Sequence, residues 1–293
     1  MAKKQEYGNE SIKSLKGAER VRKRPAVIFG SDGIEGCEHS IFEIMSNSID
    51  EAREGYGKKI IITKYLDGSV EVQDFGRGIP VDYNKNEGKF NWELLFCEMY
   101  AGGKYDNGGD NYEFSLGLNG LGLCATQYAS EYMDAEIKSG GYKYTLHFEH
   151  GENVGGLVKE EYKKRGDTGT RIKWKPDLKV FTDINIPVEY FEETIKRQAI
   201  VNDGIKFVFK NQISSASFDT KEYCYENGIQ DYVKDIAGDK AFTTPQYWEC
   251  ERVGKDREDL NEYKLKIKAS LCFSLDTPVS YTHLRAHETS AHL

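Results

Sequence analysis

The chain of 293 residues has no apolar run of membrane-spanning length, and its N-terminus lacks the apolar core of a signal peptide. None of its six cysteines lies in a CxxC pair, so neither a zinc site nor a disulfide framework is indicated. We therefore expect reduced thiols in a cytoplasmic protein with no membrane partner. Positive charge is not in excess either. The net charge of -8 argues against a main surface that grips nucleic acid, although a partner subunit or further domain can still hold DNA.

Hydrophobic residues make up 39% of the chain and charged residues 30%, which is typical of a soluble globular protein with one large or two ordinary domains. The 3.6-residue period predicts helices near residues 38–54, 91–100, 123–129, 187–201 and 228–236. Alternating and β-branched runs predict strands near residues 59–65, 69–73, 132–138, 142–149, 154–162, 170–175, 205–210 and 263–273. Long helices beside a sheet rich in hairpins indicate an α+β fold or a mixed α/β sandwich, not a parallel doubly wound sheet.

The predicted helix at residues 38–54 carries the first candidate site. Its expected buried face consists of small or apolar residues at three- and four-residue steps: Ile41, Ile44, Met45, Ser48 and Ala52. Glu43, Asn47 and Glu51 are each four residues apart, so they stack on another face. Carboxylate and amide oxygens in one line suit a divalent cation and an activated water. Taken alone, this helix also fits an ordinary amphipathic surface helix.

A second candidate lies where the predicted strand at 69–73 runs into Asp74-Phe75-Gly76-Arg77-Gly78-Ile79-Pro80. An aspartate at a strand end, followed by spaced glycines, can hold its carboxylate at a pocket rim while the backbone turns tightly. Such a carboxylate can accept a hydrogen bond from an exocyclic amine, for example that of adenine. The alternative interpretation is an ordinary Asp-Gly turn.

The third candidate is the glycine-rich run Gly117-Leu118-Asn119-Gly120-Leu121-Gly122, directly before the predicted helix at 123–129. Glycines ahead of a helix let amide N–H groups approach phosphate oxygens, and Lys104 can add a positive charge. No Gly-Lys-Ser/Thr follows, so this is not a Walker A loop. The spacing GxxGxG without a preceding strand does not fit a Rossmann fingerprint either. A flexible loop that opens a helix is the alternative.

Together and in this order, these motifs resemble the GHKL (Bergerat-fold) ATPases. The similarity is sharpest to one family, the ATPase region of the B subunits of bacterial type IIA topoisomerases, DNA gyrase and topoisomerase IV. The segments that carry it are Val21–Pro25, Phe42–Ala52, Gln73–Pro80, Ala101–Tyr105 and Thr168–Thr170. The resemblance spans about residues 7–275. It implies a GHKL α/β sandwich with a mixed sheet, followed by the start of a transducer domain of the ribosomal-protein-S5 type.

By matching position, the resemblance implies a role for each candidate residue. Glu43 would be the general base for the attacking water, and Asn47 would hold Mg²⁺ between the phosphates of ATP. Asp74 would accept from the adenine amine, with Thr170 and a water beside it. Glu51 would pair with Arg77 at the mouth of the pocket, and Gly78, Ile79 and Pro80 would line the adenine pocket. A lid over the phosphates would consist of Lys104, Gly117, Leu118, Asn119, Gly120, Leu121 and Gly122. Tyr7 would cover the nucleotide of the partner protomer in a homodimer.

The resemblance also predicts how the chain is divided. Residues 1–25 would be a dimerisation arm, which composition alone describes as a flexible, solvated basic segment. Residues 26–218 would be the ATPase domain and residues 219–276 an incomplete transducer domain. Residues 277–293 lack a clear period and hold His283, His287 and His292, so we predict a tail foreign to the natural protein. A gyrase-A-type subunit and DNA are the implied partners of the full-length protein.

Three departures from the family qualify the functional hypothesis. Asn119 stands where the lid usually has histidine, and Ala26–Phe29 replaces the usual Gly-Met-Tyr-Ile. The chain ends before the Gln-Thr-Lys loop that contacts the γ-phosphate in the family, so we expect nucleotide binding with weak turnover. The leading hypothesis is an ATP-hydrolysing topoisomerase region in which ATP closes a dimer, coupled to DNA strand passage. A clamp that dimerises on nucleotide without hydrolysis is the alternative. The basic segment before Pro25 and the Ala-Gly-Gly-Lys segment argue against MutL, Hsp90-type chaperones and histidine kinases.

Overall fold

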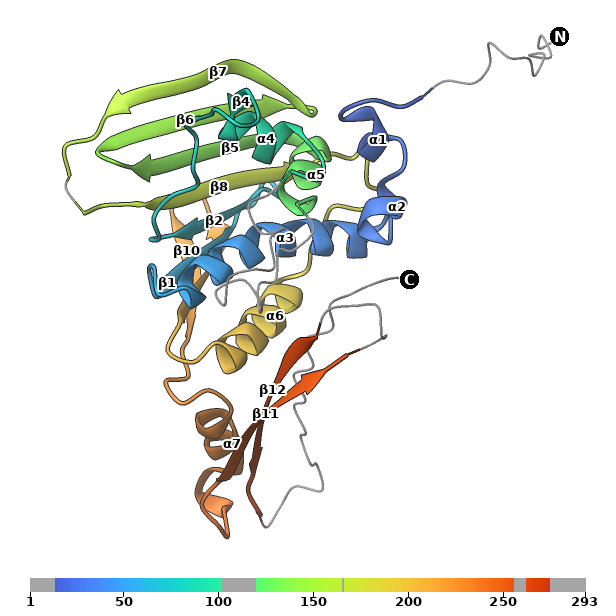
Figure 1. The fold of residues 1–293 in the computed structure, drawn as a ribbon. Coiled ribbons are helices and arrows are strands. Elements are labelled where there is room, and N and C mark those ends of the chain that lie inside the picture. The colour runs from blue at the N-terminus through green and yellow to red at the C-terminus, as the bar shows by residue number, and fades with distance from the viewer. Residues whose placement is uncertain (1–13, 102–119, 165, 256–261, 275–293) are drawn as a thin grey trace, which may run out of the picture.

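The computed structural model describes residues 14–101, 120–164, 166–255 and 262–274 (Figure 1). Its helices are α1 (Glu19–Arg22), α2 (Pro25–Phe29), α3 (Ile34–Arg53), α4 (Asn91–Cys97), α5 (Gly122–Tyr128), α6 (Val188–Val201) and α7 (Ile229–Ala237), with a 3-10 turn at Gly238–Lys240. Its strands are β1 (Lys59–Lys64), β2 (Val70–Asp74), β3 (Tyr83–Asn84), β4 (Lys89–Phe90), β5 (Ser130–Ser139), β6 (Tyr142–Glu149), β7 (Glu152–Glu161), β8 (Gly169–Pro176), β9 (Lys206–Ser214), β10 (Ser217–Tyr223), β11 (Gln246–Gly254) and β12 (Tyr263–Leu271). Five predicted site residues lie outside the described residues: Tyr7, Lys104, Gly117, Leu118 and Asn119. The predicted foreign tail lies outside them as well.

An eight-stranded sheet forms the centre of the molecule, in the order β10-β9-β1-β2-β8-β5-β6-β7. Strands β1 and β9 pair in parallel, whereas the other neighbouring pairs in this sheet are antiparallel. The hairpins β1–β2, β5–β6 and β9–β10 have short connections, which antiparallel pairing allows. The expected mixed sheet within an α/β sandwich is therefore confirmed, and a parallel doubly wound sheet is excluded.

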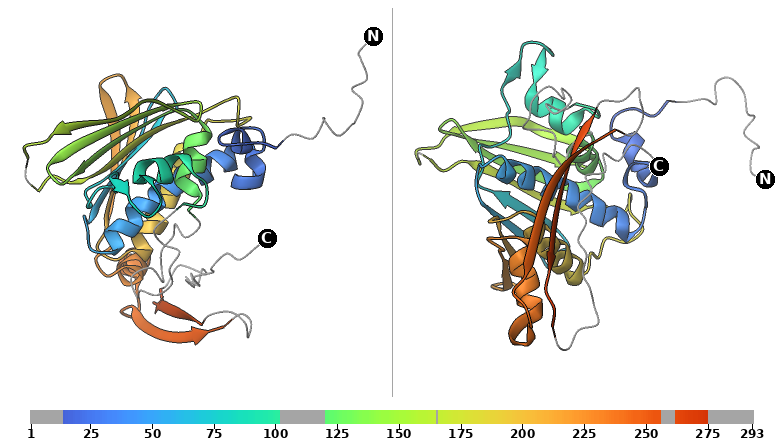
Figure 2. Two further views of the ribbon diagram at one scale, coloured as in Figure 1. Left: turned by 45° about the horizontal axis from the view of Figure 1, so that its top comes forward. Right: turned by 60° about the horizontal axis from the view of Figure 1, so that its bottom comes forward.

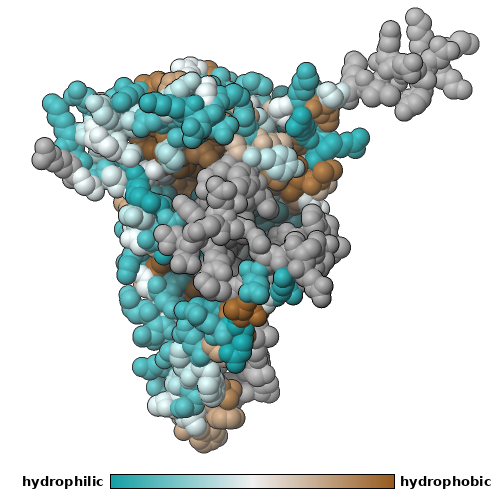
Figure 3. All heavy atoms as spheres, viewed as in Figure 1, coloured by the Kyte–Doolittle hydropathy of each residue, from teal (hydrophilic) through white to brown (hydrophobic). Residues whose placement is uncertain are grey.

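Helices cover one face of this sheet (Figure 2), and charged side chains lie on the other face. Helix α3 packs against β1, β2 and β8, and α6 packs against β9 and β10. Because side chains alternate along a strand, the helix-facing positions are apolar, as Ile62, Val72 and Trp174 are, and each is at most 3% exposed. On the opposite face, Arg171 pairs with both Glu71 and Glu136. Hydrophilic residues also predominate over much of the surface seen in Figure 3.

Helix α3 has the buried face that the sequence predicts. Ile41, Ile44 and Met45 are at most 1% exposed, and the face continues through Ser48 and Ala52. The helix begins at Ile34, four residues before the predicted start, with Gly33 as its N-cap. This extra turn is held by the burial of Cys37, whose thiol donates to the carbonyl of Asp183 at 3.4 Å. The apolar face thus sets the orientation of the whole helix on the sheet.

The basic segment before Pro25 is folded where the structure describes it, so the interpretation of residues 14–25 as flexible is wrong, although most of its basic side chains are exposed to solvent as expected. Val21 of α1 is fully buried, and Pro25 begins α2 at a position where its missing N–H costs nothing. Arg22 forms an ion pair with Asp177, which follows β8. The packing depends on residues more than a hundred positions away, which explains why the local charge pattern pointed to solvent.

The C-terminal part of the described chain adds α7 and a two-stranded antiparallel sheet of β11 and β12. Lys268 of β12 pairs with Asp203, which lies between α6 and β9. The polar run at residues 214–219 is the turn and start of a hairpin, because β9 extends to Ser214 and β10 pairs back along it. The predicted domain boundary after residue 218 consequently falls within β10. The division into ATPase and transducer domains stays a prediction.

Candidate functional site

Three predicted site residues lie on one face of α3, with a histidine that the sequence analysis did not select. Glu43, Asn47 and Glu51 are half-buried and one turn apart. His39, one turn before Glu43, lies with Nε2 3.2 Å from the Glu43 Oε1 atom, and its Nδ1 is 3.3 Å from the carbonyl of Phe29. The hydrogen bond with Glu43 raises the pKa of His39 above its usual value, even though burial acts in the opposite direction. His39 could have been found from the sequence, because it stands four residues before Glu43 and therefore shares its helix face.

The carboxylate of Glu43 rests against the first residue of α5. A Cβ atom built on Gly122 would lie only 1.8 Å from Glu43 Oε2 and 2.5 Å from its Cδ. Glycine is therefore the residue that fits here beside the present position of Glu43. Asn47 donates from Nδ2 to the carbonyl oxygen of Glu43 at 3.0 Å, which fixes the amide group along the same helix face. The glycine-rich segment and the acidic helix are thus in direct contact.

Asp74 is held in a nearly closed environment at the end of β2. Its Oδ1 atom accepts hydrogen bonds from the backbone N–H groups of Gly76, at 3.0 Å, and Thr170, at 3.1 Å. Its Oδ2 atom accepts from the Ser48 hydroxyl at 3.0 Å. The residue is 7% exposed, and burial raises the pKa of its carboxyl group against the opposing effect of these three donors. Ser48 was predicted only as part of the apolar face of the helix.

The loop after Asp74 turns tightly between α3 and β5. Gly78 has φ of +85°, and a Cβ there would lie 2.7 Å from the carbonyl oxygen of Lys138. The backbone N–H of Ile79 donates to the Thr170 hydroxyl at 3.1 Å, which ties the loop to β8. Ile79 is half-buried, and Pro80 is exposed at the rim. Gly78 thus meets both demands that favour glycine, a positive φ and a close backbone neighbour.

The pairing of Arg77 with Glu51 is present, with further partners that the sequence did not indicate. The guanidinium donates to both Glu51 oxygens at 2.8 Å and to Glu54 at 2.5 Å. It also lies over the ring of Tyr56, 3.8 Å from the centroid. These contacts, led by the hydrogen bonds to Glu51, raise the pKa of Arg77. Because the Arg77 side chain is 49% exposed, the ion pairs contribute at most about 1 kcal/mol to stability.

The structure therefore brings most of the predicted residues together from four elements. Asp74 and its loop meet α3 at Ser48 and Glu51 and meet β8 at Thr170, while α5 meets α3 at Glu43. Gly120 and Leu121 lead into α5, and the carbonyl of Gly120 accepts from the backbone N–H of Tyr100. At one end of this arrangement, the Asp74 carboxylate can accept a hydrogen bond from an amine. At the other end, the Glu43 carboxylate can accept a proton.

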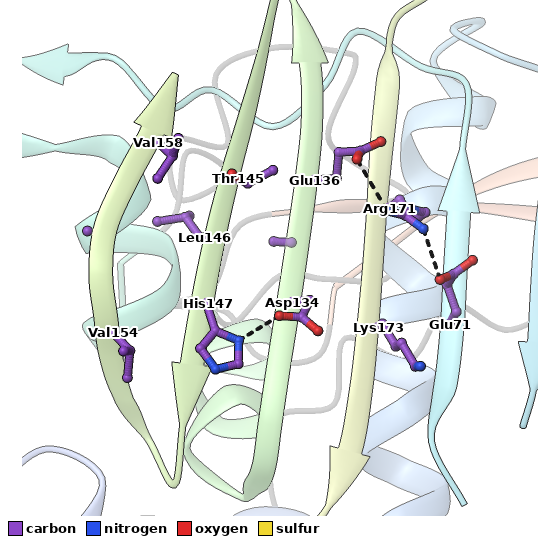
Figure 4. A pocket seen from close by; sticks show the side chains of 12 residues that line it. Glu71, Asp134, Glu136, Thr145, Leu146, His147, Val154, Val158, Arg171 and Lys173 are labelled. Carbon is purple, nitrogen blue, oxygen red and sulfur yellow. Dashed lines mark hydrogen bonds and ion pairs between the residues drawn. The ribbon is translucent and has the colours of Figure 1, made fainter. Parts of the chain in front are cut away.

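A concavity of about 400 Å³ lies elsewhere, on the charged outer face of the sheet (Figure 4). Its floor includes His147 paired with Asp134 and Arg171 between Glu136 and Glu71. It shares no residue with the predicted site. These five side chains already pair with one another, and the ammonium of Lys173 lies over the ring of Tyr65, so the lining offers no charged side chain without a contact.

Two negative observations apply to the residues that the structure describes. Among them, no cluster of three or more His, Cys, Asp or Glu side chains is arranged to hold a metal ion. Mg²⁺ needs no such cluster, because it takes one or two protein oxygens and completes its coordination with phosphates and waters. Asn47 beside Glu43 fits that donor set. Within the same ranges, no helix combines the length and apolarity needed to cross a membrane.

Comparisons with known proteins show what the chain is similar to. No protein-family model matches the chain. The DNA gyrase B protein of Thermotoga maritima is 36% identical over 230 residues, which cover 78% of this chain and 35% of the relative. The DNA topoisomerase 4 B protein of Staphylococcus aureus is 37% identical over 240 residues, covering 80% and 35%. The chain thus spans about a third of the length of these curated relatives.

Solved structures give the same result for the fold. The 43K ATPase domain of Thermus thermophilus gyrase B, in complex with an aminocoumarin, aligns with a TM-score of 0.68 and 28% identity, over 87% of this chain and 62% of that one. The topoisomerase IV ATP-binding domain of Francisella tularensis, in complex with a small-molecule inhibitor, aligns with a TM-score of 0.61 and 29% identity, over 73% and 98%.

Proposed function

The chain is homologous to the B subunits of bacterial DNA gyrase and topoisomerase IV over their GHKL-type ATPase region, and we propose that it binds ATP with Mg²⁺ and hydrolyses it. The observation that carries the proposal is the buried Asp74 carboxylate, oriented by three donors at the end of β2. Its position beside a tight glycine loop suits recognition of an amine on a planar base.

Adenine recognition is assigned to Asp74 and the loop that follows it. The carboxylate accepts a hydrogen bond from the adenine amine, and Thr170 orients a water beside it. Gly78, Ile79 and Pro80 line the pocket, and the lack of a side chain at Gly78 lets this loop lie against the Lys138 carbonyl of β5. The Arg77–Glu51 pair closes the mouth, supported by Glu54 and Tyr56 at the surface.

Phosphate binding is assigned to the glycine-rich segment and the face of α3 opposite it. Asn47 would hold Mg²⁺ through its amide oxygen, and the bound cation would supply positive charge beside the phosphates. Gly120, Leu121 and Gly122 approach the phosphates at the start of α5. By sequence position, Lys104, Gly117, Leu118 and Asn119 complete this lid, although they lie outside the described residues.

Hydrolysis is assigned to Glu43 as general base. Its carboxylate takes a proton from a water as the water oxygen attacks the γ-phosphorus, and ADP leaves. His39 hydrogen bonds the same carboxylate and orients it. This pair favours the enzyme over a clamp that binds nucleotide without hydrolysis, because such a clamp needs no oriented base.

The assembly proposed is that of the family. Residues 1–25 form the dimerisation arm, with Tyr7 over the partner's nucleotide, and ATP binding closes the homodimer. Residues 26–218 form the ATPase domain, residues 219–276 the start of the transducer, and residues 277–293 a foreign tail. In the full-length protein, closure acts on DNA together with a gyrase-A-type subunit.

Titration calorimetry with a non-hydrolysable ATP analogue and Mg²⁺ tests the nucleotide site. We expect Asp74→Ala to weaken binding by about 30-fold or more, because a buried charged acceptor is lost. Asp219→Ala, on the exposed edge strand β10, is the matched control and should bind like the wild type. Equal affinity of Asp74→Ala and the control would remove the adenine assignment. Lack of binding by folded wild type would remove the nucleotide function itself.

A further inference from the structure

Arg22 joins three separate parts of the chain through one guanidinium group. Its Nη1 atom donates to the carbonyl oxygens of Tyr128, at 3.0 Å, and Ser130, at 3.1 Å. Its Nη2 atom donates to Oδ2 of Asp177. The side chains of Arg22 and Asp177 are only 18% and 5% exposed, so the pair is shielded from solvent. Arg22 therefore binds α1 to the C-terminal end of α5 and to the residue after β8.

The C-terminal end of α5 is held by donors from outside the helix. A helix leaves its last carbonyl groups without helical partners. Here the carbonyl of Thr126 accepts from the Trp174 indole at 3.0 Å, and that of Gln127 accepts from the Ser130 hydroxyl at 2.6 Å. The Tyr128 carbonyl accepts from Arg22. Arg22 is the donor in this set that comes from the N-terminal segment.

The other end of α5 lies against Glu43. Gly122 is the first residue of the helix, and its Cα has no space for a substituent beside the Glu43 carboxylate. Helix α5 has seven residues, about 10 Å at 1.5 Å per residue. A short helix moves as one body, so a shift at its C-terminal end changes the space left for Glu43 at its start.

We propose that Arg22 is a positioning residue that holds α5 in place against Glu43 and so links the N-terminal segment to the catalytic base. The inference rests on the proposed function insofar as Glu43 is that base. In this role Arg22 acts through α5 and not on the reacting atoms. The role of Arg22 depends on the rigid fork of the guanidinium, because Nη1 serves the α5 end while Nη2 serves Asp177, and the compact ammonium of lysine has no such fixed pair of nitrogens.

Asp177 completes the arrangement. Burial acts to raise its pKa, but the hydrogen bonds from Arg22, Lys179 N–H and His150 prevail and lower it, so the carboxylate is charged near neutral pH. His150 lies with Nδ1 2.9 Å from the same oxygen that Arg22 contacts. In Arg22→Lys a cation still faces Asp177, so this variant removes the fork without leaving a buried charge unpaired.

The test compares Arg22→Lys with Arg20→Lys, which changes an exposed arginine on the same helix. Hydrogen–deuterium exchange of the α5 amides needs no nucleotide. We expect exchange in α5 to be about tenfold faster in Arg22→Lys, with exchange in α6 unchanged and the control like the wild type. Single-turnover hydrolysis should fall about tenfold or more, while the Kd for the ATP analogue stays within about threefold.

Each other outcome counts against the inference. Unchanged α5 exchange in Arg22→Lys overturns it. Equal acceleration in α5 and α6 shows general destabilisation and overturns it as well. Faster α5 exchange with wild-type hydrolysis refutes the positioning of the base. A wild type that neither binds nor hydrolyses ATP would refute the proposed function separately, and the exchange data would still decide whether Arg22 holds α5.

Discussion

Replacing Gly122 by alanine tests the contact between α5 and Glu43. The added Cβ would lie 1.8 Å from Oε2 of Glu43, where a relaxed contact needs about 3.5 Å. The carboxylate oxygen must therefore withdraw by roughly 1.7 Å. The clashing group is the end of a flexible side chain, so the rotamer change costs only about 1 kcal/mol. Gly122 does not have a positive φ, so alanine recovers about 0.4–1 kcal/mol by restricting the unfolded chain, which leaves folding stability nearly unchanged.

The consequence for catalysis is larger, because a misplacement of about 1 Å can lower a rate 100-fold. We expect single-turnover ATP hydrolysis by Gly122→Ala to fall about 100-fold, with ADP affinity reduced less than about tenfold. Gly33→Ala is the control: Gly33 is the N-cap of α3, has φ of -96°, and its added Cβ would lie 3.2 Å from its nearest neighbour. Hydrolysis at the wild-type rate by folded Gly122→Ala would refute the reasoning, since Glu43 would then act from another position.

Three further outcomes follow from the site. Ser48→Ala removes one of three donors to Asp74 and should weaken ATP-analogue binding about fivefold by calorimetry, for a loss of about 1 kcal/mol. The raised pKa of His39 implies a contribution to folding stability that is present below the unfolded pKa and is lost as pH rises through the folded pKa. Thermal melts from pH 5 to 8, about the range in which histidine titrates, should show a pH dependence of Tm that is flatter in His39→Ala than in the wild type. Arg77→Ala should change the free energy of unfolding by less than about 1 kcal/mol in denaturant titrations, because its ion pairs are exposed.

Local patterns predicted the long elements well, because their partners lie nearby in sequence or their periods are strong. The apolar face of α3 and the hairpins β1–β2 and β5–β6 are of this kind. The pattern also identified Glu43 and Asp74 as candidate side chains. Their identification required only a helix period and a strand that ends in a glycine loop.

Features that depend on distant partners escaped prediction. Helix α1 has four residues and many charges, and its folding depends on Asp177, which is 155 positions beyond Arg22. Strand β10 consists of exposed, mostly polar residues and is a strand because β9 pairs with it. The function of Ser48 is equally nonlocal, since its hydroxyl meets Asp74 from another element. His39 is different, because its four-residue spacing from Glu43 is visible in the sequence, but a pattern of acids and amides alone does not include it.

Hydrolysis by a Glu43→Gln variant tests the assignment of the base most directly. Glutamine keeps the size and a hydrogen bond to His39 but cannot take a proton from water. Glu38→Gln, on the same helix and half-buried, is the matched control. We predict that Glu43→Gln binds the ATP analogue within about threefold of wild type and still dimerises with it, while single-turnover hydrolysis falls about 100-fold or more. Hydrolysis by Glu43→Gln at the rate of Glu38→Gln would contradict Glu43 as the general base.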